Sequence, residues 1–510
     1  MKSFGKRVLE FTAGTGISRI TGLGREIMMA YLFGVSKLTD SFLVAFTIPN
    51  LLRDLFAESA LSASFIPILA KKAKKERKVF AYQIFHLLLF ITGFLTIIGM
   101  IFAPYIVKLM AYGFNNDPER LSLTISLTRW MFPFLILVSI SAWAMGIINT
   151  HHHFFIPSVA STGFNIGTIV ITLITYTYFY LHGPSAIHSM ALGVLVGGLL
   201  QFVIQIPTLF KYKFGYKPYF SFWNKDIKRA IKLWLPVTFG FAFTRINVAV
   251  DTFLISFLKT GAVSYIKYGY RVMHLPLGLF GIAVGVVALP SLAESVKDIN
   301  ELTKRLKEAF SFSLLLSIPS AIFLVSGSIT SIDLLFRYGK FSINDSINTA
   351  WALGLYSVSI PAFAIIKSIN SLYYAFENTK TPMILSGIGV LLNIVLNLSL
   401  MKIMGFKAFP LATSISNSFV MLSLILILKK KYGILPSSYI EEPLKLILVS
   451  LIAGTPVFFI SLWKVNNIGL RIFKLFSSLF IFIVSFIFII SFTSEHYKNY
   501  LKKFKIPFLK

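Results

Sequence analysis

The feature that most constrains this chain is a series of apolar stretches of membrane-spanning length that follow one another almost end to end. A helix needs roughly 20 apolar residues to cross the hydrocarbon core of a bilayer, and fourteen stretches reach that length. Of the 510 residues, 56% are hydrophobic and only 14% are charged, which is too little polar surface for a water-soluble protein of this size. The sequence therefore predicts an all-α membrane protein with fourteen transmembrane helices.

Glycine, proline and charged residues separate the predicted helices. Their approximate limits are 7–33, 41–70, 80–111, 122–148, 156–181, 187–210, 229–257, 263–293, 309–336, 347–375, 382–402, 408–428, 443–463 and 469–492. The longest connection, 211–229, is too short for a soluble domain, so we expect any function to lie among the helices.

The net charge of +29 would point to a nucleic-acid partner in a soluble protein. Here Lys and Arg concentrate in alternate connections, such as 71–78 and 429–431, and in the C-terminal tail. That asymmetry is typical of the cytoplasmic face of a membrane protein, which lies against anionic lipids. The pattern predicts that both termini are cytoplasmic and that the chain contacts membrane lipids and no nucleic acid. The chain has no cysteine, which excludes disulfides and thiol chemistry.

Several residues recur at a nearly constant offset along the chain. Arg19 is repeated as Arg245, 226 residues later, and Pro133 as Pro361, 228 residues later. Such an offset corresponds to six predicted helices, an even number, so both copies share one orientation in the membrane.

The repeat predicts two pseudo-symmetric six-helix bundles, related by a two-fold axis along the membrane normal, with the substrate path between them. The predicted parts are an N-terminal bundle at 1–210, a C-terminal bundle at 211–430, and two additional C-terminal helices with a basic cytoplasmic tail at 431–510.

Three arginines interrupt the first two predicted helices: Arg19, Arg25 and Arg53. A guanidinium group cannot shed its charge, so inside a membrane it needs a partner or a watery cavity. The sequence therefore predicts a cationic cavity suited to an anionic cargo. In the alternative interpretation, the arginines are structural and pair with neighbouring acids, namely Glu26, Asp54 and Glu58.

The sequence around these arginines resembles that of the MurJ (MviN) lipid II flippases. The resemblance rests on Ser18-Arg19-Ile20-Thr21-Gly22-Leu23-Gly24-Arg25-Glu26, on Ile48-Pro49-Asn50-Leu51-Leu52-Arg53-Asp54-Leu55-Phe56-Ala57-Glu58 and on Tyr270-Arg271-Val272-Met273. It covers the first twelve predicted helices. It implies the fold of the multidrug/oligosaccharidyl-lipid/polysaccharide exporter superfamily and a role in peptidoglycan and cell wall biogenesis in the bacterial inner membrane.

The resemblance also implies roles for particular residues. The substrate-binding positions would be Arg19, Arg25, Arg53 and Arg271, and the gating residues or charge partners would be Glu26, Asp40, Asp54 and Glu58. Asp40 with Thr39 also reads as a helix N-cap. The expected partner is lipid II, and the expected state is a monomer that is not an enzyme and has no cofactor except a candidate sodium ion.

Some family members bind sodium between an acid on the seventh helix and polar residues on the eleventh and twelfth. The matching positions here are Asp251, Asn393, Asn397 and Thr413, whose oxygens suit a hard cation. Asn397 stands where the family pattern has an acid. The alternative interpretation is a cluster of hydrogen bonds between helices.

The sequence contains no GxxxxGK[ST] motif, so ATP is not expected to drive the protein directly. The leading hypothesis is a lipid II flippase that works by alternating access. Two rivals are a flippase for another polyprenyl-diphosphate-linked oligosaccharide and a multidrug exporter of the same fold, which would favour acids and aromatic residues in its cavity. A membrane glycosyltransferase is a third rival. It would need catalytic carboxylates near one membrane face and a large external loop, and neither is evident in the sequence.

Overall fold

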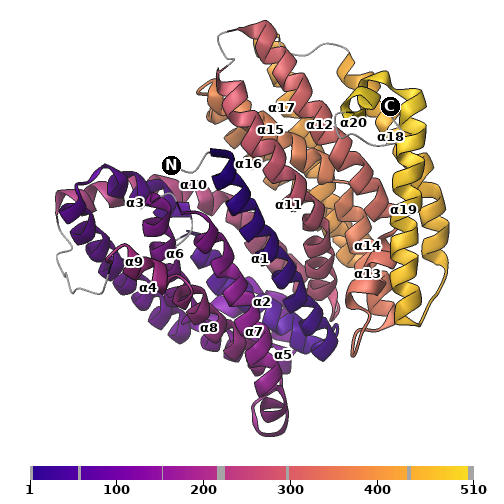
Figure 1. Cartoon of the computed structure of the whole chain (residues 1–510). Helices are drawn as coiled ribbons and strands as arrows, with labels where there is room; N and C mark the ends of the chain where they lie inside the picture. Colours follow the sequence, from indigo (N-terminus) through magenta and orange to yellow (C-terminus); the bar gives the residue numbers. More distant parts are fainter. Residues whose placement is uncertain are drawn as a thin grey trace. The chain divides into compact units, whose positions relative to one another are not determined.

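The computed structural model describes residues 4–55, 59–151, 153–214, 224–294, 298–433 and 438–502. Every regular element in these ranges is a helix, which confirms the all-α prediction. Contacts divide the chain into two compact units, Met1–Val263 and Ser264–Lys510, called unit 1 and unit 2 below (Figure 1).

The helices of unit 1 are α1 (Phe4–Phe33), α2 (Lys37–Arg53), α3 (Ser59–Lys71), α4 (Lys74–Met110), η2 (Tyr112–Asn116), α5 (Pro118–Met131), α6 (Phe134–Thr150), α7 (Phe155–His182), α8 (His188–Val203), α9 (Ile206–Lys211) and α10 (Lys225–Ile255). Helix α7 packs against α1 and α8, α2 against α5, and α3 against α10. The contact between α7 and α8 is close because of Gly197, where an added Cβ would lie 2.4 Å from the Phe164 carbonyl oxygen.

The helices of unit 2 are α11 (Ala262–Glu294), which begins at the boundary, α12 (Ile299–Ser326), α13 (Ser328–Phe336), α14 (Ile343–Ser357), α15 (Ile360–Ala375), α16 (Lys380–Met404), η3 (Gly405–Lys407), α17 (Ala408–Tyr432), α18 (Ser438–Leu462), α19 (Ile468–Thr493) and α20 (Glu495–Lys502). Helices α18 and α19 lie side by side (yellow in Figure 1) and pack on α12. Leu315 of α12, Leu446 of α18 and Phe482 of α19 belong to the buried cluster that joins them.

Each of the fourteen predicted ranges contains one or two helices. Nine stretches of the described residues are long and apolar enough to cross a membrane, and one of them, Lys380–Tyr432, contains both α16 and α17. Large apolar side chains on α4 are exposed, for example Phe94 at 57% and Ile101 at 62%, as expected for a surface that faces lipid. The chain is a multi-pass membrane protein, and the number of fourteen spans stays a prediction.

Some ranges predicted as single helices are interrupted. The range 122–148 divides between α5 and α6 at Pro133, and 347–375 divides between α14 and α15 just before Pro361. Proline has no N–H to continue the helical ladder. These two prolines are a pair of the sequence repeat, so unit 1 and unit 2 carry the same interruption.

In the range 41–70, α2 runs to Arg53 and continues as a π-helical turn at Asp54 and Leu55, and α3 is described from Ser59. The division of the chain by contacts falls after α10, whereas the predicted bundle boundary at 210 falls before it. Contact density does not test pseudo-symmetry, so the organisation into 1–210, 211–430 and 431–510 stays a prediction.

Candidate functional site

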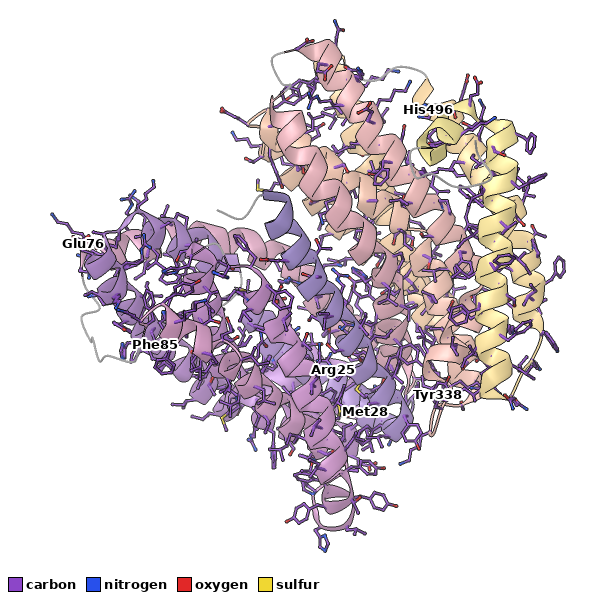
Figure 2. All side chains as sticks on the ribbon, in the orientation of Figure 1. Arg25, Met28, Glu76, Phe85, Tyr338 and His496 are labelled. Carbon is purple, nitrogen blue, oxygen red and sulfur yellow. The ribbon has the colours of Figure 1, made fainter. Side chains whose placement is uncertain are left out.

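Arg25 lies on α1, about two turns before the helix ends (Figure 2). Its Nη2 is 2.7 Å from Oε1 of Glu26, and the two side chains are only 14% and 13% exposed. The guanidinium carbon is 5.2 Å from the centre of the Phe164 ring and 5.9 Å from that of Phe46. The acid partner that the structural interpretation requires is therefore present for Arg25, and the two rings add a cation–π contribution.

Arg53, the last residue of α2, shares a carboxylate with a second arginine. Its Nη2 is 2.9 Å from Oδ1 of Asp54, while Nη2 of Arg245 on α10 is 3.0 Å from Oδ2 of the same side chain. Asp54 is 10% exposed, Arg53 25% and Arg245 40%. Asp54 therefore contacts two arginines from different helices, Arg53 of α2 and Arg245 of α10.

Arg245 is not among the predicted site residues. Its sequence signal was the repeat, which aligns Thr244-Arg245 with Ser18-Arg19. The repeat that predicts the two bundles also predicts a second arginine of the same kind.

Arg19 is half-buried on α1, which packs against α7. Nδ2 of Asn165 on α7 lies 3.0 Å from the Ser18 carbonyl oxygen and 3.3 Å from Oγ1 of Thr21. A buried polar contact of this kind favours one rotation of the helix. It therefore orients the turn of α1 that carries Arg19.

Asp40 is fully buried, and its Oδ2 lies 2.7 Å from Nη2 of Arg120 on α5. The same oxygen accepts the backbone N–H of Gly261 at 2.7 Å. The N-cap reading of Asp40 is wrong, because the N-cap of α2 is Ser36, whose hydroxyl accepts from the Thr39 N–H. Asp40 instead lies in the first turn of α2 and joins that helix to α5 and to the segment after α10. Its partner Arg120 is 80 residues away in sequence, so no local pattern predicts it.

Arg271 lies on α11 in unit 2 and is half-buried. It belongs to a different unit from Arg19, Arg25 and Arg53, so the prediction that all four line one cavity stays a prediction. Glu58, the remaining predicted charge partner, lies outside the described residues.

The predicted sodium ligands divide between the units. Asp251 lies on α10 in unit 1, where the Asn247 amide donates to its Oδ2 at 3.4 Å. In unit 2, Asn397 donates to Oδ1 of Asn393 at 3.0 Å, and Asn393 donates to Oγ1 of Thr413 at 3.4 Å.

This chain of hydrogen bonds between α16 and α17 is the cluster that the alternative interpretation expects. Asn393 is 3% exposed and Asn397 is fully buried. Among the described residues, no group of three or more His, Cys, Asp or Glu side chains could hold a metal ion. The oxygens of this cluster are neutral, so the cluster itself offers a cation no negative charge.

Comparison with known proteins extends over nearly the whole chain. The family model for lipid II flippase MurJ matches residues 29–493. A protein of Buchnera aphidicola subsp. Acyrthosiphon pisum (strain APS), named "Probable lipid II flippase MurJ", is 32% identical over 510 residues and covers 98% of this chain and 99% of its own.

Comparison with solved structures points to the same family. The structure named "Lipid II flippase MurJ, inward closed conformation" matches with a TM-score of 0.81 at 29% identity, covering 94% of this chain and 98% of that one. An inward-facing multidrug resistance MATE family transporter of the MOP superfamily matches with a TM-score of 0.59 at 12% identity, covering 82% and 92%. The second likeness shows the fold alone. The matches to MurJ confirm the resemblance seen in the sequence: this chain belongs to the MurJ family of lipid II flippases, which are membrane transporters and not enzymes.

Proposed function

We propose that this chain moves lipid II, the undecaprenyl-diphosphate-linked peptidoglycan precursor, from the inner to the outer leaflet of the bacterial inner membrane. Family membership supports this cargo. The structural observation that carries it is the cluster of Arg53, Asp54 and Arg245, in which two partly exposed arginines contact the same carboxylate. Two guanidinium groups held close together in this way suit an anion with several oxygens.

The diphosphate of the cargo suits these groups. Guanidinium forks bind phosphate oxygens through paired, charge-assisted hydrogen bonds. Asp54 is a side chain that can rotate away when a more highly charged anion arrives. In the proposed mechanism, Arg19, Arg25, Arg53 and Arg271 line one central cavity and bind the diphosphate in this way, and Arg245 contributes beside them.

The energy source follows from the charge of the cargo. An inside-negative potential favours outward movement of an anion by about 2.3 kcal/mol per charge per 100 mV. We propose that the membrane potential drives alternating access, in which Glu26 and Asp54 neutralise the arginines between transport events. Asp40 and Glu58 are the proposed gating residues, and the buried Asp40–Arg120 pair supports such a role for Asp40 because it joins separate helices.

The proposed topology has fourteen spans, both termini in the cytoplasm, and two six-helix bundles at 1–210 and 211–430 followed by 431–510. The positions of the helices and the shared interruption at Pro133 and Pro361 support it. We propose a monomer in contact with membrane lipids and no nucleic acid. A sodium ion bound through Asp251, Asn393, Asn397 and Thr413 is a further proposal, supported by the kind of oxygens present and weakened by the neutral Asn397.

Depletion of the protein in its host tests the cargo. We expect lipid II to accumulate in the inner leaflet and the cells to lyse, and a plasmid copy to restore growth. Accumulation of a different polyprenyl-linked sugar would favour the first rival. Unchanged lipid-linked intermediates together with increased sensitivity to cationic drugs would favour the multidrug exporter.

A further inference from the structure

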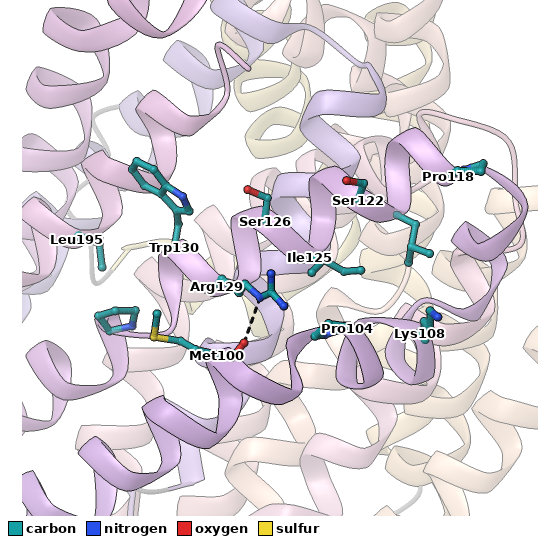
Figure 3. Close-up of a pocket in the computed structure, with 12 residues that line it drawn as sticks. Met100, Pro104, Lys108, Pro118, Ser122, Ile125, Ser126, Arg129, Trp130 and Leu195 are labelled. Carbon is teal, nitrogen blue, oxygen red and sulfur yellow. Dashed lines mark hydrogen bonds between the residues drawn. The ribbon is translucent and has the colours of Figure 1, made fainter. Parts of the chain in front are cut away.

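A groove on unit 1 contains none of the site residues described above and has two cations of its own (Figure 3). It has a volume of about 820 Å³ and is lined by residues of α4, α5 and α8, among them Pro104, Lys108, Arg129, Trp130 and Leu195. This volume lies within the range of about 300–1,000 Å³ that is usual for small-molecule sites.

Arg129 is held in the groove by a defect in α4. The Met100 carbonyl would normally accept the N–H of the residue four positions later, but that residue is Pro104, which has no N–H. Nε of Arg129 lies 3.2 Å from this oxygen and donates to it (dashed in Figure 3). The bond fixes the guanidinium group by one edge and leaves both Nη atoms available.

Among the residues that the structure describes, no acid pairs with either cation of the groove. Within the described part of the chain, the bond to Met100 is the one hydrogen bond of the Arg129 side chain, and neither Arg129 nor Lys108 forms an ion pair. Both side chains are exposed. A permanent charge on a membrane helix requires an anionic partner or water. Because the described residues supply no such partner to Arg129 or Lys108, a counter-ion for the groove would have to come from outside the protein.

The surroundings indicate where that counter-ion comes from. Tyr105 is 71% exposed, Tyr112 56% and Trp130 37%, and exposed Tyr and Trp are typical of the interface between head groups and hydrocarbon. Phe94 and Ile97, on α4 with Tyr105, are also exposed. They extend the apolar surface of α4 away from the Tyr and Trp side chains. A cationic groove at the interface with an apolar surface beside it matches an anionic lipid.

We propose that this groove binds an anionic phospholipid of the outer leaflet, with its phosphate on the Nη atoms of Arg129 and its acyl chains along the apolar face of α4. Lys108 lies eight residues beyond Met100, about 12 Å further along α4, so it contacts the head group rather than the same phosphate oxygens. The leaflet follows from the proposed topology, which places the connection between α4 and α5 outside. The ligand class does not depend on the cargo.

Thermal unfolding of the delipidated full-length protein in detergent tests the proposal. The midpoint is measured against increasing phosphatidylglycerol and against phosphatidylcholine with the same acyl chains. We expect wild-type protein to prefer phosphatidylglycerol, and Arg129→Gln to lower the apparent affinity for it roughly tenfold through loss of a charge-assisted contact. Lys108→Gln should lower it less, and neither variant should change the response to phosphatidylcholine.

The control is Lys402→Gln, which removes an exposed cation from the last turn of α16 in unit 2 and should leave the preference unchanged. Arg129→Lys should restore part of it. If Arg129→Gln does not fold, Lys108→Gln decides. If phosphatidylglycerol and phosphatidylcholine raise the unfolding midpoint of the wild type equally, the proposal is wrong. It is also wrong if inorganic phosphate raises the midpoint as much as phosphatidylglycerol does. Stabilisation by lipid II that requires Arg129, without stabilisation by phosphatidylglycerol, also overturns it and assigns the groove to the cargo.

Discussion

Two groups of cations, one in each unit, use the same residue types in different ways. In unit 1, Arg25, Arg53 and Arg245 are paired with carboxylate side chains. In unit 2, Arg471 and Lys474 donate to backbone carbonyls, among them those of Asn466 and Trp463 at the turn between α18 and α19, and we call these two residues the carbonyl clamp.

The carbonyl clamp binds carbonyl groups at helix ends. Nζ of Lys474 lies 2.9 Å from the Ser461 oxygen and 2.6 Å from the Trp463 oxygen, where α18 finishes. Nη1 of Arg471 lies 2.6 Å from the Arg337 oxygen, and its guanidinium carbon is 5.7 Å from the ring centre of Tyr338 (labelled in Figure 2). Lys474 is 5% exposed. These cations satisfy carbonyls that the helix itself leaves without donors.

The difference between the two groups lies in how easily the partner can be replaced. A backbone carbonyl cannot leave without unfolding its turn, whereas a carboxylate side chain can rotate away when another anion competes. Arg53 and Arg245 are also more exposed, at 25% and 40%, than Lys474 at 5%, whereas Arg25 at 14% is intermediate. We infer that the carboxylate-paired arginines serve binding and that the carbonyl clamp serves stability.

The largest expected effect is the loss of transport when a cavity arginine is removed. Arg53→Ala should abolish growth in a depletion strain because the diphosphate loses a guanidinium fork, and Arg19→Ala and Arg271→Ala should do the same. The amount of each variant in the membrane should stay near the wild-type level. Full complementation by any two of these variants would contradict the cationic cavity.

Lysine variants sharpen this test, because lysine keeps the charge but has no planar fork. Arg53→Lys should therefore also be impaired. The matched control is Lys474→Met, which removes one positive charge from the carbonyl clamp and should still support growth at a permissive temperature.

The sequence predicts well the features that depend on local pattern, such as helix positions and unusual charges within the helices. Length and hydropathy place a helix in every predicted range, and the fixed charge of Arg25 and Arg53 identifies them as unusual before any contact is known. The role of Arg120 depends on Asp40, 80 residues away, and no local pattern predicts it. The repeat marks Arg245 as an arginine like Arg19, but its contact with the distant Asp54 cannot be predicted from the sequence. The hydrogen bond from Arg129 to Met100 is equally invisible, since Pro104 reveals a missing donor but not which residue replaces it.

Arg245→Ala should produce a smaller loss than Arg53→Ala. Without Arg245, Asp54 interacts more strongly with Arg53, so the cargo competes less well for that guanidinium group. We expect roughly tenfold weaker binding of lipid II, in line with the loss of a hydrogen bond between charged groups, measured by titration of purified protein. Arg245→Lys should recover part of the affinity. Unchanged binding by Arg245→Ala would show that the shared carboxylate has no role.

Lys474→Met should lower thermal stability while sparing transport. It leaves the Ser461 and Trp463 carbonyls without their donor, at a cost of about 1–3 kcal/mol, and methionine keeps most of the apolar stem. The unfolding midpoint should fall by several degrees, and Lys402→Met, which removes an exposed lysine, should leave it unchanged. A normal midpoint combined with loss of growth would reverse the assignment of the two groups.

The smallest expected effect concerns sodium, which would add a cation to the neutral cluster of unit 2. Oδ1 of Asn393 accepts from Asn397 at 3.0 Å, so Asn397→Asp replaces a donor with a second oxygen and places two acceptors together. A sodium ion between them would relieve that repulsion, because hard cations prefer oxygen ligands. The unfolding midpoint in sodium chloride and in choline chloride measures this binding by mass action. We expect a small sodium-specific increase for the wild type, a larger one for Asn397→Asp and none for Asp251→Asn. If neither the wild type nor Asn397→Asp responds to sodium, the amide cluster is a hydrogen-bonded helix contact, and the proposal of a sodium site is wrong.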